Sequence, residues 1–259
     1  MNHQVKLKAW RPAVVAAVMA VTFASASTAR AQAAAPAPQF SKWSFDAGIG
    51  WDNGISGHLN SSGIGTINNQ VVVMTSNTYE DVYGTGLHLR FGGAYALSED
   101  TEVVGVFTFQ SLDADEVTPA GDIGFSNLYA QYTDYQSTSL DVGLRRYAEL
   151  NPQIRMYGEG TIGLGFIDEI DATIVAPGAN IAAETTDFYD QTTAFVLGAN
   201  AGVLIGGERS PVRYYVQLGL RFTTGLSEVD DLIGTGLDEI NDKSSRWTMP
   251  FVAGIRVRF

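Results

Sequence analysis

The chain has 259 residues, of which 45% are hydrophobic and 17% are charged, and it contains 28 glycines. This composition is too apolar for a disordered protein, and the absence of cysteine excludes disulfides, thiolate metal sites and cysteine nucleophiles. The formal net charge of −12 at pH 7 argues against nucleic acid as a partner, because an acidic surface repels phosphate.

The first 33 residues have the composition of a secretory signal peptide. The apolar part is shorter than the ~20 residues that a membrane-spanning helix needs, which disfavours an anchor helix. We expect residues 1–33 to be removed on export and residues 34–41 to form a short leader. The parts of the signal are a basic start (Lys6, Lys8 and Arg11), an apolar stretch (12–26) and an A-x-A cleavage site (Ala31-Gln32-Ala33).

Eight later segments alternate apolar residues with polar residues or glycine at a period of two, which is typical of β-strands. Each is near the ~10 residues that a tilted membrane strand needs. The sequence therefore predicts an all-β fold, a closed antiparallel transmembrane β-barrel over residues 42–259. The segments are Trp43–Asp52, Leu87–Leu97, Thr101–Gln110, Ser139–Tyr147, Arg155–Ile167, Thr193–Ile205, Val212–Phe222 and Phe251–Phe259.

The connections between these segments alternate between short and long, as in barrels with short periplasmic turns and long outer loops. Two stretches of the long connections are themselves similar to strands. We interpret residues 127–135 as the fourth strand projecting above the membrane, and residues 70–83 as a similar extension of the second. If either were an independent spanning strand, the count would become ten instead of eight.

Alternation alone also fits a water-soluble sandwich, in which the apolar face would form the core. Tryptophans and a phenylalanine at the strand ends favour the membrane, because aromatic residues gather at both interfaces of a barrel. We expect Trp43 and Phe259 at one interface and Trp51 and Trp247 at the other. The apolar face would then meet outer-membrane lipid.

The segment Gly254-Ile255-Arg256-Val257-Arg258-Phe259 resembles the C-terminal signal of small bacterial outer-membrane barrels of the OmpA, OmpX and opacity-protein type. The resemblance implies that Gly254, Ile255, Val257 and Phe259 form an assembly signal read by the barrel-assembly machinery of a Gram-negative bacterium. It extends over nearly all of residues 42–259, and we expect no peptidoglycan-binding domain. It is specific for architecture and weak for function.

In a barrel of eight strands, side chains fill the interior, and buried charges there must pair. We predict a charge network in the lumen that is either a structural plug or a narrow ion path, while Arg213 and Arg258 lie at a hydrated periplasmic mouth. The network residues are Asp46, His88, Arg90, Glu102, Asp141, Arg145, Glu159, Arg221 and Arg256.

No catalytic residues and no cofactor are expected, since neither His58 nor His88 lies in a serine–histidine or aspartate–histidine signature. The long loops are acidic and suit Ca²⁺ or Mg²⁺, although no ligand set can be named. Lys243 and Arg246 are candidate contacts for lipopolysaccharide phosphates. The sequence thus favours a non-enzymatic barrel for envelope structure or surface contact, with a small diffusion channel and an adhesin as alternatives.

Overall fold

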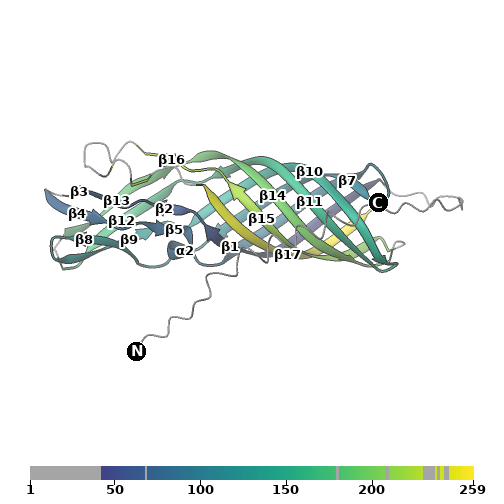
Figure 1. Cartoon of the computed structure of the whole chain (residues 1–259), viewed down its shortest axis with the longest axis horizontal. Coiled ribbons are helices and arrows are strands. Elements are labelled where there is room, and N and C mark those ends of the chain that lie inside the picture. The colour runs from purple at the N-terminus through teal and green to yellow at the C-terminus, as the bar shows by residue number, and fades with distance from the viewer. Residues whose placement is uncertain are drawn as a thin grey trace, which may run out of the picture.

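A computed structural model describes residues 42–67, 69–178, 181–207, 210–229, 237, 240–241 and 245–259. Its main feature is a closed antiparallel barrel with the strand order β1-β17-β15-β14-β11-β10-β7-β6 (Figure 1), which confirms the eight predicted strands. The expected signal peptide and leader lie outside the described residues. The barrel strands are β1 (Trp43–Ser56), β6 (Gly86–Ala96), β7 (Thr101–Leu112), β10 (Tyr135–Asn151), β11 (Ile154–Ile167), β14 (Thr192–Ile205), β15 (Val212–Thr223) and β17 (Arg246–Arg258).

The strands β1 and β17 close the barrel by pairing along almost their whole length. The register runs from Ser44 opposite Arg258 to Ser56 opposite Trp247. The expected assembly-signal residues Gly254, Ile255 and Val257 therefore lie in the strand that completes the wall. In the described part of the chain no helix is long and apolar enough to span a membrane.

The barrel is apolar outside and charged inside. On β1, the side chains of Phe45 and Ile49 are exposed, whereas those of Ser44 and Asp46 are buried. This arrangement is the reverse of a water-soluble barrel, and a closed wall leaves no strand edge unpaired in lipid. The protein is therefore an outer-membrane β-barrel. Other apolar side chains exposed on the wall are Phe91, Phe107, Leu140, Val142, Leu144, Ile162, Leu164, Leu197, Val216 and Ile255.

Exposed aromatic residues mark the two ends of this apolar wall. Trp43 contacts Tyr95 at a ring-centroid distance of 4.9 Å at the end where β1 begins. At the other end, Trp51 stacks on Phe251 at 4.7 Å, and Trp247 contacts Phe222 at 5.0 Å. Phe259 follows β17 and is also exposed. Aromatic residues at both ends match the two interfaces of a bilayer.

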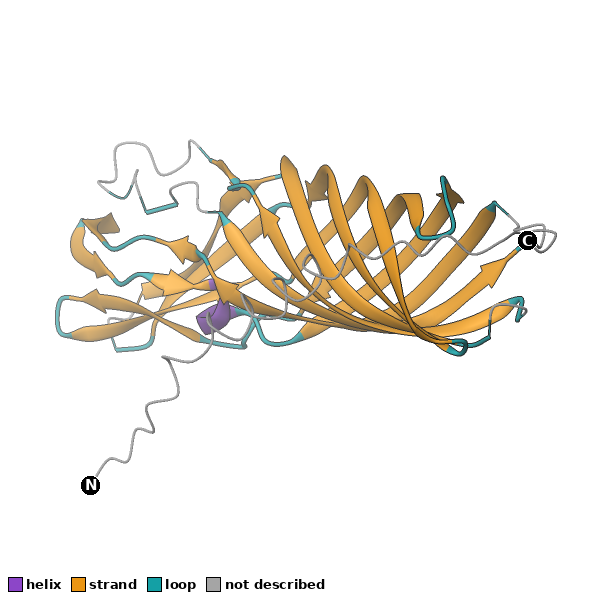
Figure 2. Cartoon of the chain, turned by 45° about the vertical axis from the view of Figure 1, so that its right-hand side comes forward, coloured by secondary structure: helices purple, strands orange, loops and turns teal. Residues whose placement is uncertain are grey.

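The long connections fold into a second body, which we call the cap (Figures 1 and 2). Its main sheet has seven strands in the order β16-β13-β12-β9-β8-β4-β3, and β2 pairs separately with β5. A short helix, α2 (Tyr79–Val82), follows β5 and begins with a capping box at Thr78. The strands are β2 (His58–Asn60), β3 (Gly63–Ile67), β4 (Gln70–Met74), β5 (Asn77–Thr78), β8 (Thr118–Ile123), β9 (Ser126–Tyr132), β12 (Ile170–Ala176), β13 (Ile181–Asp190) and β16 (Ser227–Glu228).

The cap corrects the interpretation of residues 127–135 and 70–83 as extensions of barrel strands. Strand β9 pairs with β8 and β12, whereas β10 begins separately at Tyr135 and pairs with β7 and β11. Residues 70–83 form β4, β5 and α2, and β4 pairs with β3 and β8. These segments therefore form hydrogen bonds with strands of the other connections instead of extending the barrel strands.

The hydrophobic core of the cap continues into the outer mouth of the barrel. Within the cap, Val72, Ile123, Leu128 and Ile170 are fully buried. The same cluster includes residues at the outer ends of four barrel strands, and the cap is therefore seated on the barrel as part of one core. These residues are Leu112, Tyr135, Ile167 and Ala194.

Candidate functional site: the barrel lumen

The centre of the lumen holds an ion cluster around Arg145. Strand register places Arg145 on β10 opposite Glu159 on β11 and opposite Glu102 on β7. Its guanidinium Nη2 lies 2.7 Å from Glu159 Oε2 and 2.7 Å from Asp46 Oδ2. Arg90 Nη2 donates to Glu159 Oε1 at 2.7 Å. The cluster therefore ties together four strands that are not all neighbours: β1, β6, β10 and β11.

A second group extends from this cluster to the periplasmic end. Glu102 forms an ion pair with Arg256 and accepts a hydrogen bond from the Tyr147 hydroxyl at 2.9 Å. Arg256 also donates to Tyr147 Oη and, at 2.6 Å, to Ser44 Oγ. Arg258 Nη2 lies 3.8 Å from Glu102 Oε1. Because Arg145 Nη1 also lies 3.8 Å from Glu102 Oε2, this one carboxylate interacts with three arginines and a tyrosine.

A third group lies on the outer side of the central cluster. Arg221 Nη1 lies 3.7 Å from Asp141 Oδ2, and the Ser139 hydroxyl donates to that carboxylate at 2.8 Å. His88 Nδ1 lies 3.5 Å from Asp52 Oδ2. The side-chain amide of Gln110 also donates to Asp52. The three groups fill the lumen along its length.

All nine residues predicted for the lumen network point inward, and eight of them are buried, with Arg221 half-buried. The structure brings Asp46, Arg90, Glu102, Arg145, Glu159 and Arg256 into contact with one another. It places Asp141 with Arg221 and His88 with Asp52 as separate pairs. Asp52, Tyr147 and Gln110 were not predicted members. Tyr147 follows Arg145 at a spacing of two. Because alternate residues share one face of a strand, this spacing could have placed Tyr147 in the lumen from the sequence alone.

Two arginines outside the network are more buried than predicted. Arg213 lies at the periplasmic end as expected, but it is only 3% exposed, in a pocket with Tyr147, Leu204 and Pro211. Arg246 is also buried, and its guanidinium lies 4.2 Å from the ring centroid of Tyr135. Arg246 is therefore not an outward contact for lipopolysaccharide, and Lys243 lies outside the described residues.

Little space remains between the side chains of the lumen. A cavity between His88 and Arg221 has a volume of about 20 Å³, and a pocket at the periplasmic end, bordered by Arg213 and Arg258, has about 10 Å³. About 10–15 Å³ on this measure holds one water molecule. Each of these two cavities is therefore large enough for one or two water molecules.

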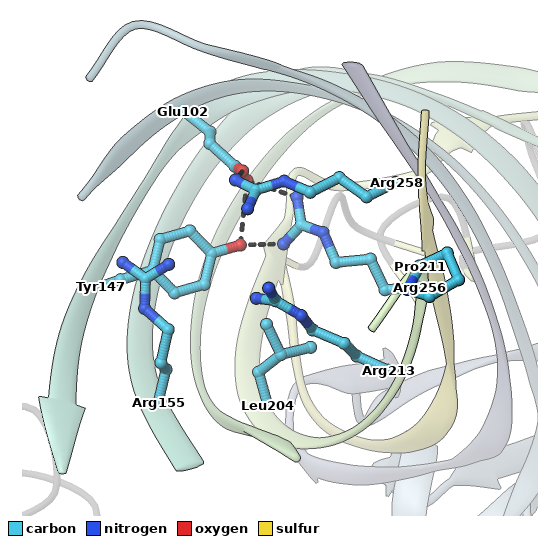
Figure 3. A pocket seen from close by; sticks show the side chains of 8 residues that line it. All are labelled: Glu102, Tyr147, Arg155, Leu204, Pro211, Arg213, Arg256 and Arg258. Atoms are coloured by element: carbon cyan, nitrogen blue, oxygen red, sulfur yellow. Dashed lines mark hydrogen bonds and ion pairs between the residues drawn. The ribbon is translucent and has the colours of Figure 1, made fainter. Parts of the chain in front are cut away.

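The pocket at the periplasmic end is lined mainly by arginines (Figure 3). Arg155, Arg213, Arg256 and Arg258 border it together with a single carboxylate, Glu102. The Arg155 guanidinium lies 4.5 Å from the ring centroid of Tyr147. The pocket opens where the short connections join the strands, so it faces the periplasm.

Outside the lumen, the described histidine His58 lies beside a serine in the cap. His58 Nδ1 lies 3.0 Å from Ser76 Oγ, but the Ser76 hydroxyl donates to the Asn60 carbonyl at 2.9 Å. Within the described ranges, no three His, Asp or Glu side chains lie close enough together to hold a metal ion. Several acidic residues of the connection 224–245 lie outside the described residues.

Comparisons with known proteins find distant likenesses among solved structures. No protein-family model matches the sequence, and no curated protein is significantly similar to it. Neisserial surface protein A is 13% identical with a TM-score of 0.42, over 84% of this chain and 97% of that one. OprG of Pseudomonas aeruginosa is 9% identical with a TM-score of 0.42, over 85% and 97%. Ail of Yersinia pestis is 14% identical with a TM-score of 0.37, over 83% and 99%.

Proposed function

We propose that this outer-membrane barrel is a non-conducting and non-enzymatic anchor that holds a folded β-sheet cap at the cell surface, for envelope integrity or surface contact. The observation that supports the proposal is the pairing of charged side chains across the lumen, together with the core of the cap at the outer ends of the barrel strands. A buried ion network crosses the barrel, and the core of the cap fills the outer mouth. A protein that transports solutes through its lumen needs neither seal.

Planar-bilayer recording tests the closure directly. We expect the purified barrel to give no stepwise current, because the cavities in the lumen are the size of single waters. A variant with Arg90, Arg145 and Glu159 replaced by serine is the control, since it removes the central ion cluster. Only preparations with heat-modifiable gel mobility would be used. Stepwise currents from the unaltered protein would favour the diffusion channel.

The arrangement around the histidines supports the absence of enzyme activity. The Ser76 hydroxyl lies 2.9 Å from the Asn60 carbonyl oxygen and 3.0 Å from His58 Nδ1, so a backbone acceptor competes with the imidazole for its proton. His88 is buried beside Asp52 within the lumen. We expect no hydrolysis of labelled casein or of p-nitrophenyl butyrate. Hydrolysis that disappears in His58→Ala would contradict this part of the proposal.

The cap gives the adhesin alternative a specific basis. Ile64 on β3 lies opposite Val73 on β4, and both side chains are exposed. Phe125, at the tip of the β8–β9 hairpin, is fully exposed. Exposed apolar residues far from the membrane wall are typical of a contact surface. We expect Phe125→Ser combined with Ile64→Ser to weaken binding of whole cells to host-cell monolayers, with assembly unchanged.

Point substitutions are a sharper test of adhesion than deletion of the connection 226–245. Leu226, Leu237 and Ile240 from that connection belong to the buried core of the cap. Deleting them would unfold the cap as well as remove surface. The surface-contact role would be rejected if the Phe125 and Ile64 variant adhered as well as the unaltered protein.

Four partners are part of the proposal. The outward apolar wall suits outer-membrane lipid and lipopolysaccharide, and β17 suits recognition by the barrel-assembly machinery through Phe259 and Ile255. The acidic connections suit divalent cations. We expect Phe259→Ala to reduce the heat-modifiable fraction in membranes, while Phe125→Ala on the cap leaves it unchanged.

A further inference from the structure

A buried arginine crosses the outer mouth of the barrel. Arg246, the first residue of β17, is 3% exposed, and its guanidinium lies 4.2 Å from the ring centroid of Tyr135, the first residue of β10. In the closed strand order, three strands separate β17 from β10 on either side, so these two strands lie on opposite sides of the barrel. The contact between Arg246 and Tyr135 therefore spans the mouth from wall to wall.

The short helix α2 of the cap joins this contact, at the junction of cap and barrel (Figure 2). The ring centroid of Tyr79, its first residue, lies 5.2 Å from the Arg246 guanidinium and 6.1 Å from the Tyr135 ring, which it meets edge-on. Tyr83, directly after the helix, lies 6.0 Å from Tyr135 and 6.1 Å from Tyr79. All three rings are buried. We call Arg246 and these three tyrosines the aromatic latch, because two of its residues belong to the barrel and two to the cap.

Backbone contacts hold α2 against both sides of the mouth. On the side of β17, the Tyr79 amide donates to the Gly57 carbonyl oxygen at 3.1 Å. A Cβ at Gly57 would lie 3.2 Å from the Cα of Arg246, so the glycine allows the two segments to approach closely. On the side of β10, the Tyr83 hydroxyl donates to the carbonyl oxygen of Thr133 at 3.1 Å. The helix is therefore positioned over the mouth by the same segments that supply the latch.

The chemistry of the aromatic latch suits a closing contact. A guanidinium is attracted to the face of an aromatic ring, and the attraction is stronger where water is excluded. Arg246 makes this contact with a barrel tyrosine and a cap tyrosine at once. We propose that the aromatic latch holds the cap over the outer mouth, and that its release opens the lumen to small solutes from outside. This inference rests on the proposed closure of the lumen, and it assigns the outer part of that closure to one arginine and one helix.

The chain contains no cysteine, so a single introduced thiol can report on the mouth. Ser137 lies two residues after Tyr135 on the inward face of β10 and is 8% exposed, and Ser137→Cys is almost isosteric. The measurement is the rate at which a small, charged methanethiosulfonate added outside intact cells modifies this thiol. We expect Arg246→Met to raise the rate about tenfold or more, because the rate follows the fraction of molecules with an open latch. Arg146→Met is the matched control and should leave the rate unchanged, since Arg146 is 63% exposed at the other end of the barrel.

Ring substitutions separate the cation–aromatic contact from packing in general. Tyr135→Phe keeps the ring, and we expect a rate within about twofold of the reference. Tyr135→Leu removes the ring and should raise the rate about as much as Arg246→Met. The double variant should be no faster than the faster single variant, because both changes break the same contact.

The outcomes distinguish the aromatic latch from the closure of the lumen. Rapid modification of Ser137→Cys in the otherwise unaltered protein would contradict the closure itself. Slow modification that Arg246→Met and Tyr135→Leu leave unchanged would overturn the latch while the closure stands. Equal acceleration by Tyr135→Phe and Tyr135→Leu would overturn it as well, since the ring would then not matter. Heat-modifiable mobility confirms that each barrel is folded, and if Arg246→Met does not assemble, Tyr79→Leu in the cap carries the same prediction.

Discussion

Arg145 on β10 and Glu159 on β11 face each other across the lumen wall, with Nε and Nη2 of the arginine 2.9 and 2.7 Å from Oε2 of the glutamate. Both side chains are almost inaccessible to solvent. The two residues lie opposite each other because the short β10–β11 connection fixes the register of the hairpin. This one ion pair therefore contributes both to the stability of the barrel and to the filling of its lumen.

Breaking this pair should destabilise the barrel strongly. Glu159→Gln leaves Arg90 and Arg145 without one of their buried carboxylate partners, and we expect a loss of about 3–5 kcal/mol in the free energy of unfolding. The measurement is urea unfolding in lipid vesicles, monitored by tryptophan fluorescence. Arg146→Gln is the control and should cost less than about 1 kcal/mol, because its ion pair with Asp100 is exposed. Equal effects of the two variants would contradict the central role of the cluster.

A charge placed on the wall should test the membrane orientation. Val142 is 62% exposed near the middle of β10, and we expect Val142→Arg to cost about 2–4 kcal/mol in lipid vesicles. The matched control is Ile64→Arg on the cap, where the side chain is 68% exposed. This variant should unfold almost as the unaltered protein does, because it faces water. A small effect of Val142→Arg would mean that this face does not meet hydrocarbon.

Glycine 121 in the cap should tolerate no side chain. Its φ of +143° is rare for other residues, and a Cβ there would lie 1.9 Å from the Val73 carbonyl oxygen on β4. We expect Gly121→Ala to destabilise the cap by more than about 2 kcal/mol. At Gly124 the φ is +59° and nothing lies within 4 Å, so Gly124→Ala should cost only about 1 kcal/mol. Limited chymotrypsin digestion, which cleaves after the buried tyrosines of the cap once the cap unfolds, separates the two variants.

Alkaline pH should unfold the cap. Burial raises the pKa of Tyr79, Tyr83 and Tyr132 above the ordinary value of 10. A raised pKa means that folding favours the protonated phenol, so this stability is present below pH ~10 and is lost as pH rises beyond it. We expect these three tyrosines to ionise only in a cooperative step above pH ~10, visible as tyrosinate absorbance at 295 nm.

Tyr132→Phe is the matched variant. It removes one of the three titrating groups, together with a 3.3 Å hydrogen bond to Asn60, and should make the alkaline transition less steep. Ionisation of all tyrosines near pH 10 without a change in circular dichroism would contradict the prediction.

The sequence predicts the barrel well because the period of two is a local property. The wall side chains, such as Phe45 and Ile49, alternate with Asp46 along one strand, and the structure retains this pattern. The sequence also supports much of the ion network, since Arg145 and Glu159 face each other once the hairpin is short. The predicted strands needed only modest extension, for example to residues 135–151 for β10.

The cap is missed because its pairings join distant connections. The run Gln70–Met74 has the composition of a strand, but its partner β8 lies in the next connection, where Val72 is opposite Ile123. No periodicity within either segment indicates that β4 pairs with β8. The buried position of Arg213 is missed for a related reason, because Leu204 and Pro211, which share its pocket, come from the neighbouring strand and turn.

The order of strands in the cap limits how its surface can evolve. Each of the four outer connections contributes to one sheet: β3 and β4 from the first, β8 and β9 from the second, β12 and β13 from the third, and β16 from the fourth. Hypervariable loops diversify freely only when each is independent of its neighbours. Here an insertion in one connection must be matched in the next, so we expect antigenic drift to be confined to hairpin tips such as Phe125.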